Sequence, residues 1–289
     1  GYETTKWAEK YSTLNTRHST LVKVQHHYAH ALAVMAEHGL RDEKVLAFCW
    51  DGTGYGDDGT IWGSEVLHAD ASEYRRVASL RPFRLLGGEK AVREPRRVAL
   101  ELLFECFTLD EVLALENPTV DAFKPAEIRL LHQAWEKGIN APVTTSMGRL
   151  FDAVASLCGI CQHLGFEGES GMRIEALARD ADVKPYPLPL EEGCLEWRHM
   201  IREIAHMSDA EAVASRFMAT LVETVFAVAS RMPDMPLPFA GGVFQNRTLV
   251  ERIVARCETE GRTFYLPEKL SPNDGAVALG QLWYALGQE

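Results

Sequence analysis

Two histidines four residues apart are the first side chains in this sequence that could do chemistry. His26 and His30 belong to the segment VQHHYAH, where an expected strand gives way to an expected helix. This spacing puts both imidazoles on one helix face, near its positive amino-terminal end, where neutral rings could share a metal ion. His27 stands where an HExxH zinc protease has its glutamate, which argues against that class. The pair alone is better explained as surface or capping histidines, so a metal site needs further ligands.

A glycine-rich turn follows the apolar residues 45–50. Asp51 stands at its entrance, and Gly52, Gly54 and Gly56 follow at alternate positions. Glycines let backbone amides approach phosphate oxygens, and successive amides can form an anion site. The same pattern also suits an ordinary hairpin loop, which is the more frequent case.

Other candidates lie at expected strand ends and helix starts, which is where open α/β sheets bind ligands. Gly241 and Gly242 end a strand before the helix that begins near Asn246. Asp274 stands at the start of the last helix, where a helix N-cap is the favoured explanation and a metal ligand the alternative. Residues 144–152 add hydroxyls, a cation and the carboxylate of Asp152, and residues 166–169 add acids at a tight turn.

The hydrophobic pattern predicts the elements that must bring these side chains together. It predicts a three-stranded meander followed by a mostly helical block. Three prolines within Lys184–Pro189 then force an extended connector. A strand, helix, strand, helix order near the carboxyl-terminal end predicts parallel pairing, and so an α/β fold with one mixed sheet. The expected strands are 21–24, 45–50, 60–67, 74–80, 237–240 and 263–266, and the expected helices are 5–11, 27–38, 92–107, 109–115, 126–137, 147–162, 209–232, 246–259 and the segment after Asp274.

The composition argues against several classes of protein. A formal net charge of −11 and a pI near 5.4 argue against nucleic acid as the main partner, because phosphate backbones are bound by an excess of Lys and Arg. No uninterrupted apolar stretch has the roughly 20 residues of a membrane span, and the first residues lack the apolar region of a signal peptide. We therefore expect a cytoplasmic protein with no membrane partner. The six cysteines are scattered, which suits reduced thiols better than disulfides.

Seven segments, in this order, resemble the carboxyl-terminal region of the HypF carbamoyltransferases. More distantly, they resemble the universal tRNA threonylcarbamoyladenosine transferase and the antibiotic O-carbamoyltransferases. The resemblance implies an α/β fold of the actin/sugar-kinase/Hsp70 type. Residues 1–40 would end a truncated first lobe, and residues 41–289 would form the second lobe, with a helical insertion at about 88–180. The segments are VQHHYAH, DGTGYGDDGTIWGSE, REPRRVAL, SMGRLFDAVASL, FEGES, GGVFQN and SPNDGAVALGQ.

The resemblance also implies a set of site residues. One iron or zinc ion would be held by four ligands, His26, His30, Asp51 and Asp274. ATP or carbamoyl-adenylate would occupy a neighbouring pocket, and no residue is assigned as catalytic. The nucleotide contacts would be Gly52, Gly54, Gly56, Asp152, Gly168, Glu169, Gly241, Gly242 and Asn246.

The implied activity is carbamoyl transfer from carbamoyl-adenylate to the carboxyl-terminal cysteine thiol of HypE, for the cyanide ligands of nickel-iron hydrogenases. Amino-terminal modules of the same polypeptide would supply the adenylate. Two departures from the family pattern concern partner or substrate contacts, namely residues 87–90 (GGEK) and Met218. Two alternatives stay open: an O-carbamoyltransferase acting on a small-molecule hydroxyl, and a non-catalytic lobe that binds metal and partner.

Overall fold

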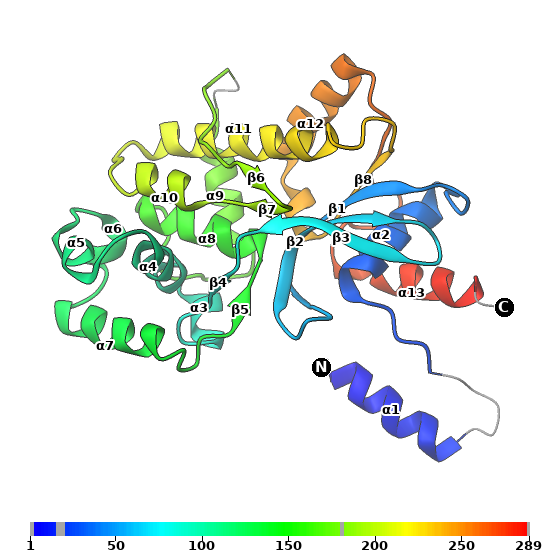
Figure 1. Cartoon of the computed structure of the whole chain (residues 1–289), viewed down its shortest axis with the longest axis horizontal. Coiled ribbons are helices and arrows are strands. Elements are labelled where there is room, and N and C mark those ends of the chain that lie inside the picture. The colour runs from blue at the N-terminus through cyan, green and yellow to red at the C-terminus, as the bar shows by residue number, and fades with distance from the viewer. Residues whose placement is uncertain (1–2, 16–20, 180–181, 288–289) are drawn as a thin grey trace.

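A mixed β-sheet lies in the middle of the structure, with helices on both of its faces (Figure 1). The structure is a computed structural model that describes residues 3–15, 21–179 and 182–287. The central strand, β1 (Val45–Tyr55), begins with the apolar residues 45–50. The even-numbered residues of this stretch face a large apolar core and the odd-numbered ones face a smaller core. A strand that is covered on both faces has a continuous apolar sequence, which explains the pattern.

The pairing of the longer strands confirms the predicted meander and the mixed sheet. β1 pairs antiparallel with β2 (Ile61–Ala69), which pairs antiparallel with β3 (Tyr74–Leu80). On its other side β1 pairs parallel with β8 (Leu237–Ala240), which pairs parallel with β9 (Phe264–Tyr265). The helix α12 (Arg247–Glu260) provides the return connection that parallel strands need. The shorter strands are β4 (Phe83–Arg84), β5 (Val143–Thr144), β6 (Leu190–Glu191) and β7 (Cys194–Leu195).

Helices between β4 and β8 surround the large core. One of them, α11 (Ala210–Ala229), is long and apolar enough to cross a membrane, but 72% of its most apolar window is buried, as in the core helix of a folded domain. Residues 184–189 connect these helices without regular structure, as their prolines predict. The helices are α3 (Glu89–Arg93), α4 (Pro95–Cys106), α5 (Leu109–Ala114), α6 (Pro118–Asp121), α7 (Pro125–Glu136), α8 (Met147–Leu157), α9 (Glu169–Leu177), α10 (Arg198–Ile204) and α11.

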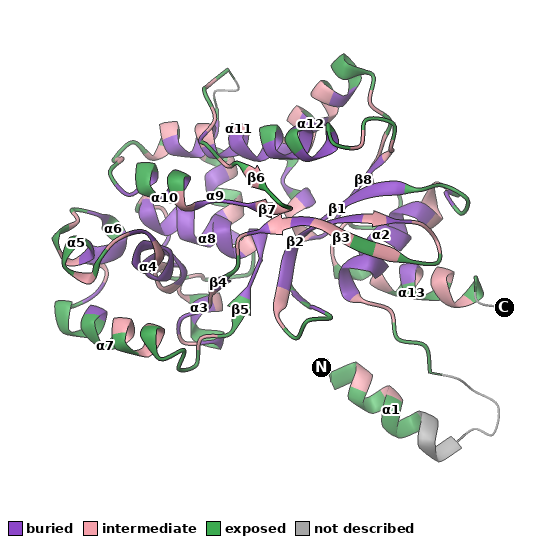
Figure 2. Ribbon diagram, in the orientation of Figure 1, coloured by how far each residue is buried: buried purple, intermediate pink, exposed green. Residues whose placement is uncertain are grey.

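Two helices cover the opposite face of the sheet. The helix α2 (His26–Glu37) is buried over residues 26–35, as its purple ribbon shows (Figure 2). The last helix, α13 (Val277–Leu286), packs against it so closely that a Cβ on Gly280 would lie 1.9 Å from the carbonyl oxygen of Ala29. Residues 26–37 therefore share a core with β1 and β2, and a lobe boundary near residue 40 stays a prediction.

Several expected elements differ in the structure. Residues 21–24 were expected as a strand, but they have no regular secondary structure and pair with no strand in the described part of the chain. The first helix, α1, extends over Glu3–Asn15. The glycine-rich residues 51–60 were expected as a turn between two strands, and residues 56–60 form that turn. Residues 51–55 instead continue β1, whose register with β2 shifts between Trp50 and Gly54.

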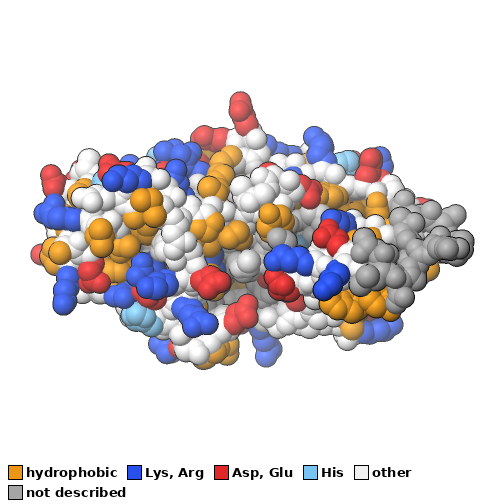
Figure 3. All heavy atoms as spheres, turned by 90° about the horizontal axis from the view of Figure 1, so that it is seen from below, with side chains coloured by type: hydrophobic (Ala, Val, Ile, Leu, Met, Phe, Trp, Pro, Cys, Tyr) orange, Lys and Arg blue, Asp and Glu red, His pale blue; other side chains and the backbone are white. Residues whose placement is uncertain are grey.

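Charged side chains of both signs share the face that Figure 3 shows. Lysines and arginines stand among aspartates and glutamates there, with apolar side chains between them. Binding to a phosphate backbone needs an excess of positive charge in one place. The described side chains on this face are therefore not arranged as a continuous basic surface.

Candidate metal centre and adjoining pocket

Four side chains from three parts of the chain meet beside the central strand β1. His26 and His30 come from the first turns of α2, Asp51 from β1, and Asp274 from the short 3-10 helix η2 (Asp274–Ala276). One ligand atom of each lies within 4.8 Å of the others. The His26 Nε2 atom is 3.2 Å from His30 Nε2. Asp51 Oδ2 is 3.1 and 3.6 Å from these two nitrogens, and Asp274 Oδ1 is 3.4 and 3.3 Å from them.

These separations fit a single bound ion. Nitrogen and carboxylate ligands lie about 2.0–2.2 Å from zinc, so neighbouring ligands of a tetrahedral site are about 3.4 Å apart. The five distances lie between 3.1 and 3.6 Å. Two imidazoles and two carboxylates are a donor set that suits zinc or iron. The side chain of Asp274 is 71% exposed and that of Asp51 only 13%, so the cluster is open on the Asp274 side.

Asp51 is held in place by backbone donors as well as by the histidines. Its Oδ1 atom accepts hydrogen bonds from the backbone N–H groups of Gly52 (2.7 Å) and Gly242 (3.3 Å). Burial acts to raise the pKa of Asp51, but the imidazoles of His26 and His30 and the Gly52 N–H outweigh it and hold the pKa below its ordinary value. The carboxylate is therefore ionised and can attract a cation.

A pocket of about 800 Å³ adjoins the cluster, and Asp51 and Asp274 belong to its wall. Five of the predicted nucleotide contacts also line it, namely Gly52, Asp152, Gly168, Gly242 and Asn246. The backbone at Gly52 is close to α8, because a Cβ on Gly148 would lie 2.8 Å from the Gly52 Cα. The predicted residues from β1, from α8 and from the amino-terminal ends of α9 and α12 thus come together around one space.

Asn246 offers this pocket a hydrogen-bond donor. Its Oδ1 atom caps α12 by accepting a hydrogen bond from the Leu249 N–H at 2.9 Å. Its Nδ2 atom is buried and makes no hydrogen bond within the described part of the chain. Because buried donors are normally paired, this amide is suited to a ligand in the pocket.

The other predicted contacts, Gly54, Gly56, Glu169 and Gly241, do not line this pocket. A Cβ at Gly54 would lie 2.2 Å from His27, and one at Gly56 would lie 2.2 Å from Trp62. Gly241 has a φ of +99° and would place a Cβ 2.2 Å from the Trp50 carbonyl oxygen. These three positions need glycine for close packing. The carboxylate of Glu169 accepts from the Gly165 N–H at 2.6 Å and pairs with Arg173.

Arg149 lines the pocket although it was not among the predicted site residues. Its side chain is buried in α8, where Nη1 lies 2.7 Å from Asp152 Oδ2 and donates to the Val92 carbonyl oxygen at 3.1 Å. Burial raises the pKa of Asp152, and the positive charge of Arg149 acts against that shift. The three-residue spacing of the pair on one helix was the signal that could have revealed it. The remaining wall comes from Thr53, Gly148, Phe151, Glu167, Gly171, Met172, Glu175, Val243, Gln245 and Asn273.

Two family models match most of the chain. A family described as "Carbamoyltransferase, Kae1-like Domain, second subdomain" matches residues 47–281, and the "HypF Kae1-like domain" family matches residues 1–37. The carbamoyltransferase HypF of Synechocystis sp. is 38% identical over 90% of this chain and 36% of its own length. The chain thus spans little more than a third of that relative.

A solved structure and a more distant relative extend this similarity. The solved structure, described as full-length HypF in the phosphate- and nucleotide-bound form, matches with a TM-score of 0.86 and 30% identity over 99% of this chain and 45% of that one. A tRNA N6-adenosine threonylcarbamoyltransferase of Aromatoleum aromaticum is 31% identical over 50% of this chain and 47% of its own length.

Proposed function

The chain belongs to the HypF carbamoyltransferase family, and from this premise we propose that it performs carbamoyl transfer from carbamoyl-adenylate to a cysteine thiol. The observation that carries the proposal is the meeting of four ligand side chains at the wall of a pocket of about 800 Å³. Small-molecule and cofactor sites commonly have volumes of about 300–1,000 Å³. The pocket is therefore large enough for an adenylate.

His26, His30, Asp51 and Asp274 would hold one iron or zinc ion. When bound, such an ion supplies a Lewis acid that stabilises negative charge on a phosphate or carbonyl oxygen. Asp51 and Asp274 belong both to the cluster and to the pocket wall. A substrate in the pocket would therefore lie beside the ion.

The nucleotide would contact the five predicted residues that line the pocket, namely Gly52, Asp152, Gly168, Gly242 and Asn246. Asn246 also marks the amino-terminal end of α12, where the positive end of the helix dipole favours a phosphate. The other four predicted contacts would support the pocket wall from behind instead of touching the nucleotide. Three of them are closely packed glycines, Gly54, Gly56 and Gly241, and the fourth is Glu169, which pairs with Arg173.

The transfer itself exchanges one bond at the carbamoyl carbon. The acceptor sulfur forms a bond to that carbon, the bond from the carbon to the AMP phosphate oxygen breaks, and the thiol proton is released to solvent. AMP leaves with the electron pair of the broken bond, so negative charge grows on its phosphate. Fixed donors and cations placed at such a position lower the barrier, and the Asn246 amide and the α12 amino terminus are suited to this.

The acceptor thiol comes from outside this chain. All six cysteines are free, and burial raises the pKa of every one of their thiols above its ordinary value. A raised pKa removes the thiolate that attacks, and no cysteine lines the pocket. The carboxyl-terminal cysteine of HypE is the proposed acceptor, for cyanide synthesis in nickel-iron hydrogenase maturation. Free cysteines also suit the cytoplasm.

The fold would be that of the actin/sugar-kinase/Hsp70 group with an incomplete first lobe. Residues 1–40 would end that lobe, and residues 41–289 would form the second, with helices inserted at about 88–180. Support comes from the two family matches, which divide between residues 37 and 47. The part of the relatives that lies outside the matched region would supply the adenylate.

The test uses the full-length protein that contains this region, with His26 and His30 replaced by Ala. We expect the double variant to lose bound metal and to lose transfer from carbamoyl phosphate and ATP to HypE. Transfer at the parent rate would sink the proposal. Modification of a sugar hydroxyl in place of HypE would indicate an O-carbamoyltransferase, and HypE binding without any transfer by the parent protein would indicate a non-catalytic lobe.

A further inference from the structure

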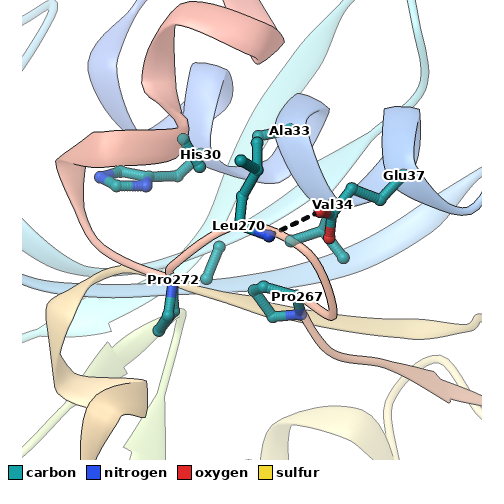
Figure 4. Close-up of a pocket in the computed structure, with 9 residues that line it drawn as sticks. His30, Ala33, Val34, Glu37, Pro267, Leu270 and Pro272 are labelled. Carbon is teal, nitrogen blue, oxygen red and sulfur yellow. Dashed lines mark hydrogen bonds between the residues drawn. The ribbon is translucent and has the colours of Figure 1, made fainter.

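The last residue of α2 binds a segment that lies just before one of the candidate ligands. The Glu37 carboxylate accepts hydrogen bonds from three successive backbone N–H groups, those of Glu268 (3.0 Å), Lys269 (3.2 Å) and Leu270 (2.9 Å). Successive N–H groups that converge in this way form an anion site. Figure 4 shows Glu37 facing Leu270, with His30 on the same helix.

Asp274 follows this segment and is not held by burial. Its side chain is 71% exposed, whereas those of His26 and His30 are 7% and 1% exposed. A hydrogen bond from the Gly241 N–H to the Pro272 carbonyl oxygen, 2.7 Å long, fixes the chain just before it. An exposed ligand needs such support, because a metal site tolerates only small errors in ligand position.

Beyond Asp274 the chain returns to the same helix. Gly280 of α13 packs directly on the backbone of Ala29, which lies between the two histidines. The segment with Asp274 is therefore fastened to α2 twice, at Glu37 before the ligand and at Ala29 after it. The helix α2 thus carries two of the ligands and two of the three attachments that hold the segment with Asp274.

We infer that Glu37 is a positioning residue for the metal centre, which acts by holding residues 268–270 so that Asp274 stays within reach of the histidines. The inference rests on the proposed use of the cluster as a metal site. Groups that orient metal ligands typically contribute about 10- to 100-fold to metal affinity. Glu37→Ala should weaken zinc binding by about tenfold. Glu37→Gln keeps an acceptor oxygen and should restore part of that affinity.

The experiment measures zinc affinity by competition with a chelator for the parent, Glu37→Ala, Glu37→Gln and the control Glu43→Ala, which alters an exposed glutamate in the turn before β1. Each Glu37 variant is also made in an Asp274→Ala background, or Asp274→Asn if Asp274→Ala binds no zinc. If Glu37 acts through Asp274, replacing Glu37 weakens zinc binding in the parent and has almost no effect on zinc affinity in this background. If Glu37 only stabilises α2, its replacement lowers zinc affinity by the same factor in the parent and in the Asp274 background. Hydrogen exchange at the amides of residues 268–270 should accelerate in Glu37→Ala.

Equal losses in both backgrounds, or an unchanged affinity in Glu37→Ala, would overturn the inference and leave the proposed function intact. A parent protein that binds no zinc or iron would count against the proposed function as well. The exchange measurement separates these cases, since it reports the attachment at residues 268–270 without any metal.

Discussion

Asp51 and Glu101 are carboxyl groups buried in two different regions, and their surroundings move their pKa values in opposite directions. Burial raises the pKa of Glu101, on α4, to about 8. Its Oε1 atom accepts from the Arg84 N–H and the Trp135 indole, while its buried Oε2 atom makes no hydrogen bond within the described residues. Asp51 is buried too, but its histidine partners and the Gly52 N–H hold its pKa below the ordinary value.

The difference teaches that burial alone does not decide the charge of these two carboxyl groups, because the partners of Asp51 outweigh its burial and those of Glu101 do not. The helical region tolerates a neutral acid, which contributes hydrogen bonds to packing. The candidate metal centre beside β1 keeps an anion where a cation would bind. Three experiments can break or sharpen this comparison.

Asp51→Asn should have the largest effect. It keeps the shape of the side chain and removes the negative charge, so we expect zinc affinity to fall by about 100-fold or more, beyond the loss typical of a group that only orients a ligand. Chelator competition measures it, with Asp42→Asn in the exposed turn before β1 as the control. An unchanged affinity would mean that the ionised carboxylate of Asp51 has no role in holding a metal.

Removal of the metal should destabilise the protein by a smaller amount. A ligand that is about 100-fold above its Kd stabilises the folded state by about 2.7 kcal/mol, so chelation should lower the free energy of unfolding by about that much. Asp51→Asn should show no such difference between zinc and chelator. A thermal or urea unfolding series on both proteins measures this, and an equal shift in both would indicate metal bound elsewhere.

Glu101→Gln should have the smallest effect, and it depends on pH. The folded protein keeps the Glu101 proton up to about pH 8, while the unfolded chain loses it near pH 4.5. The stability from this group is therefore complete below about pH 4.5 and is lost as the pH rises through about 8. Relative to the parent, Glu101→Gln should gain about 2 kcal/mol between about pH 5 and about pH 6.5.

Urea unfolding at both pH values measures this gain, with Glu116→Gln at an exposed position between α5 and α6 as the control. Parallel stability curves for the parent and Glu101→Gln would show that Glu101 is ionised in the folded protein. The two buried carboxyl groups would then not differ in charge.

The sequence predicted some parts of the site for sound physical reasons. The spacing of His26 and His30 is local, so helix geometry alone put both on one face. Asp51 and Asp274 were added only through the family resemblance, which is itself confirmed. Their meeting depends on the pairing of β1 with β8 and on the packing of α13 against α2, which local patterns do not encode.

Other parts were beyond the sequence because one pattern fits two structures. Gly54 and Gly56 could serve phosphate contact or close packing, and the structure packs them against His27 and Trp62. Residues 21–24 have three strand-forming apolar side chains, but they pair with no strand among the described residues. Arg149 was read as part of a polar segment, and its place in the pocket wall depends on the approach of α8 to β1.

The distance along α2 between His30 and Glu37 has a consequence for how this helix can change. Seven residues are nearly two full helical turns, so the imidazole and the carboxylate point the same way. Inserting or deleting one residue between them would swing the carboxylate about 100° around the helix axis. Natural variants should therefore differ between His30 and Glu37 by substitutions, and not by insertions or deletions.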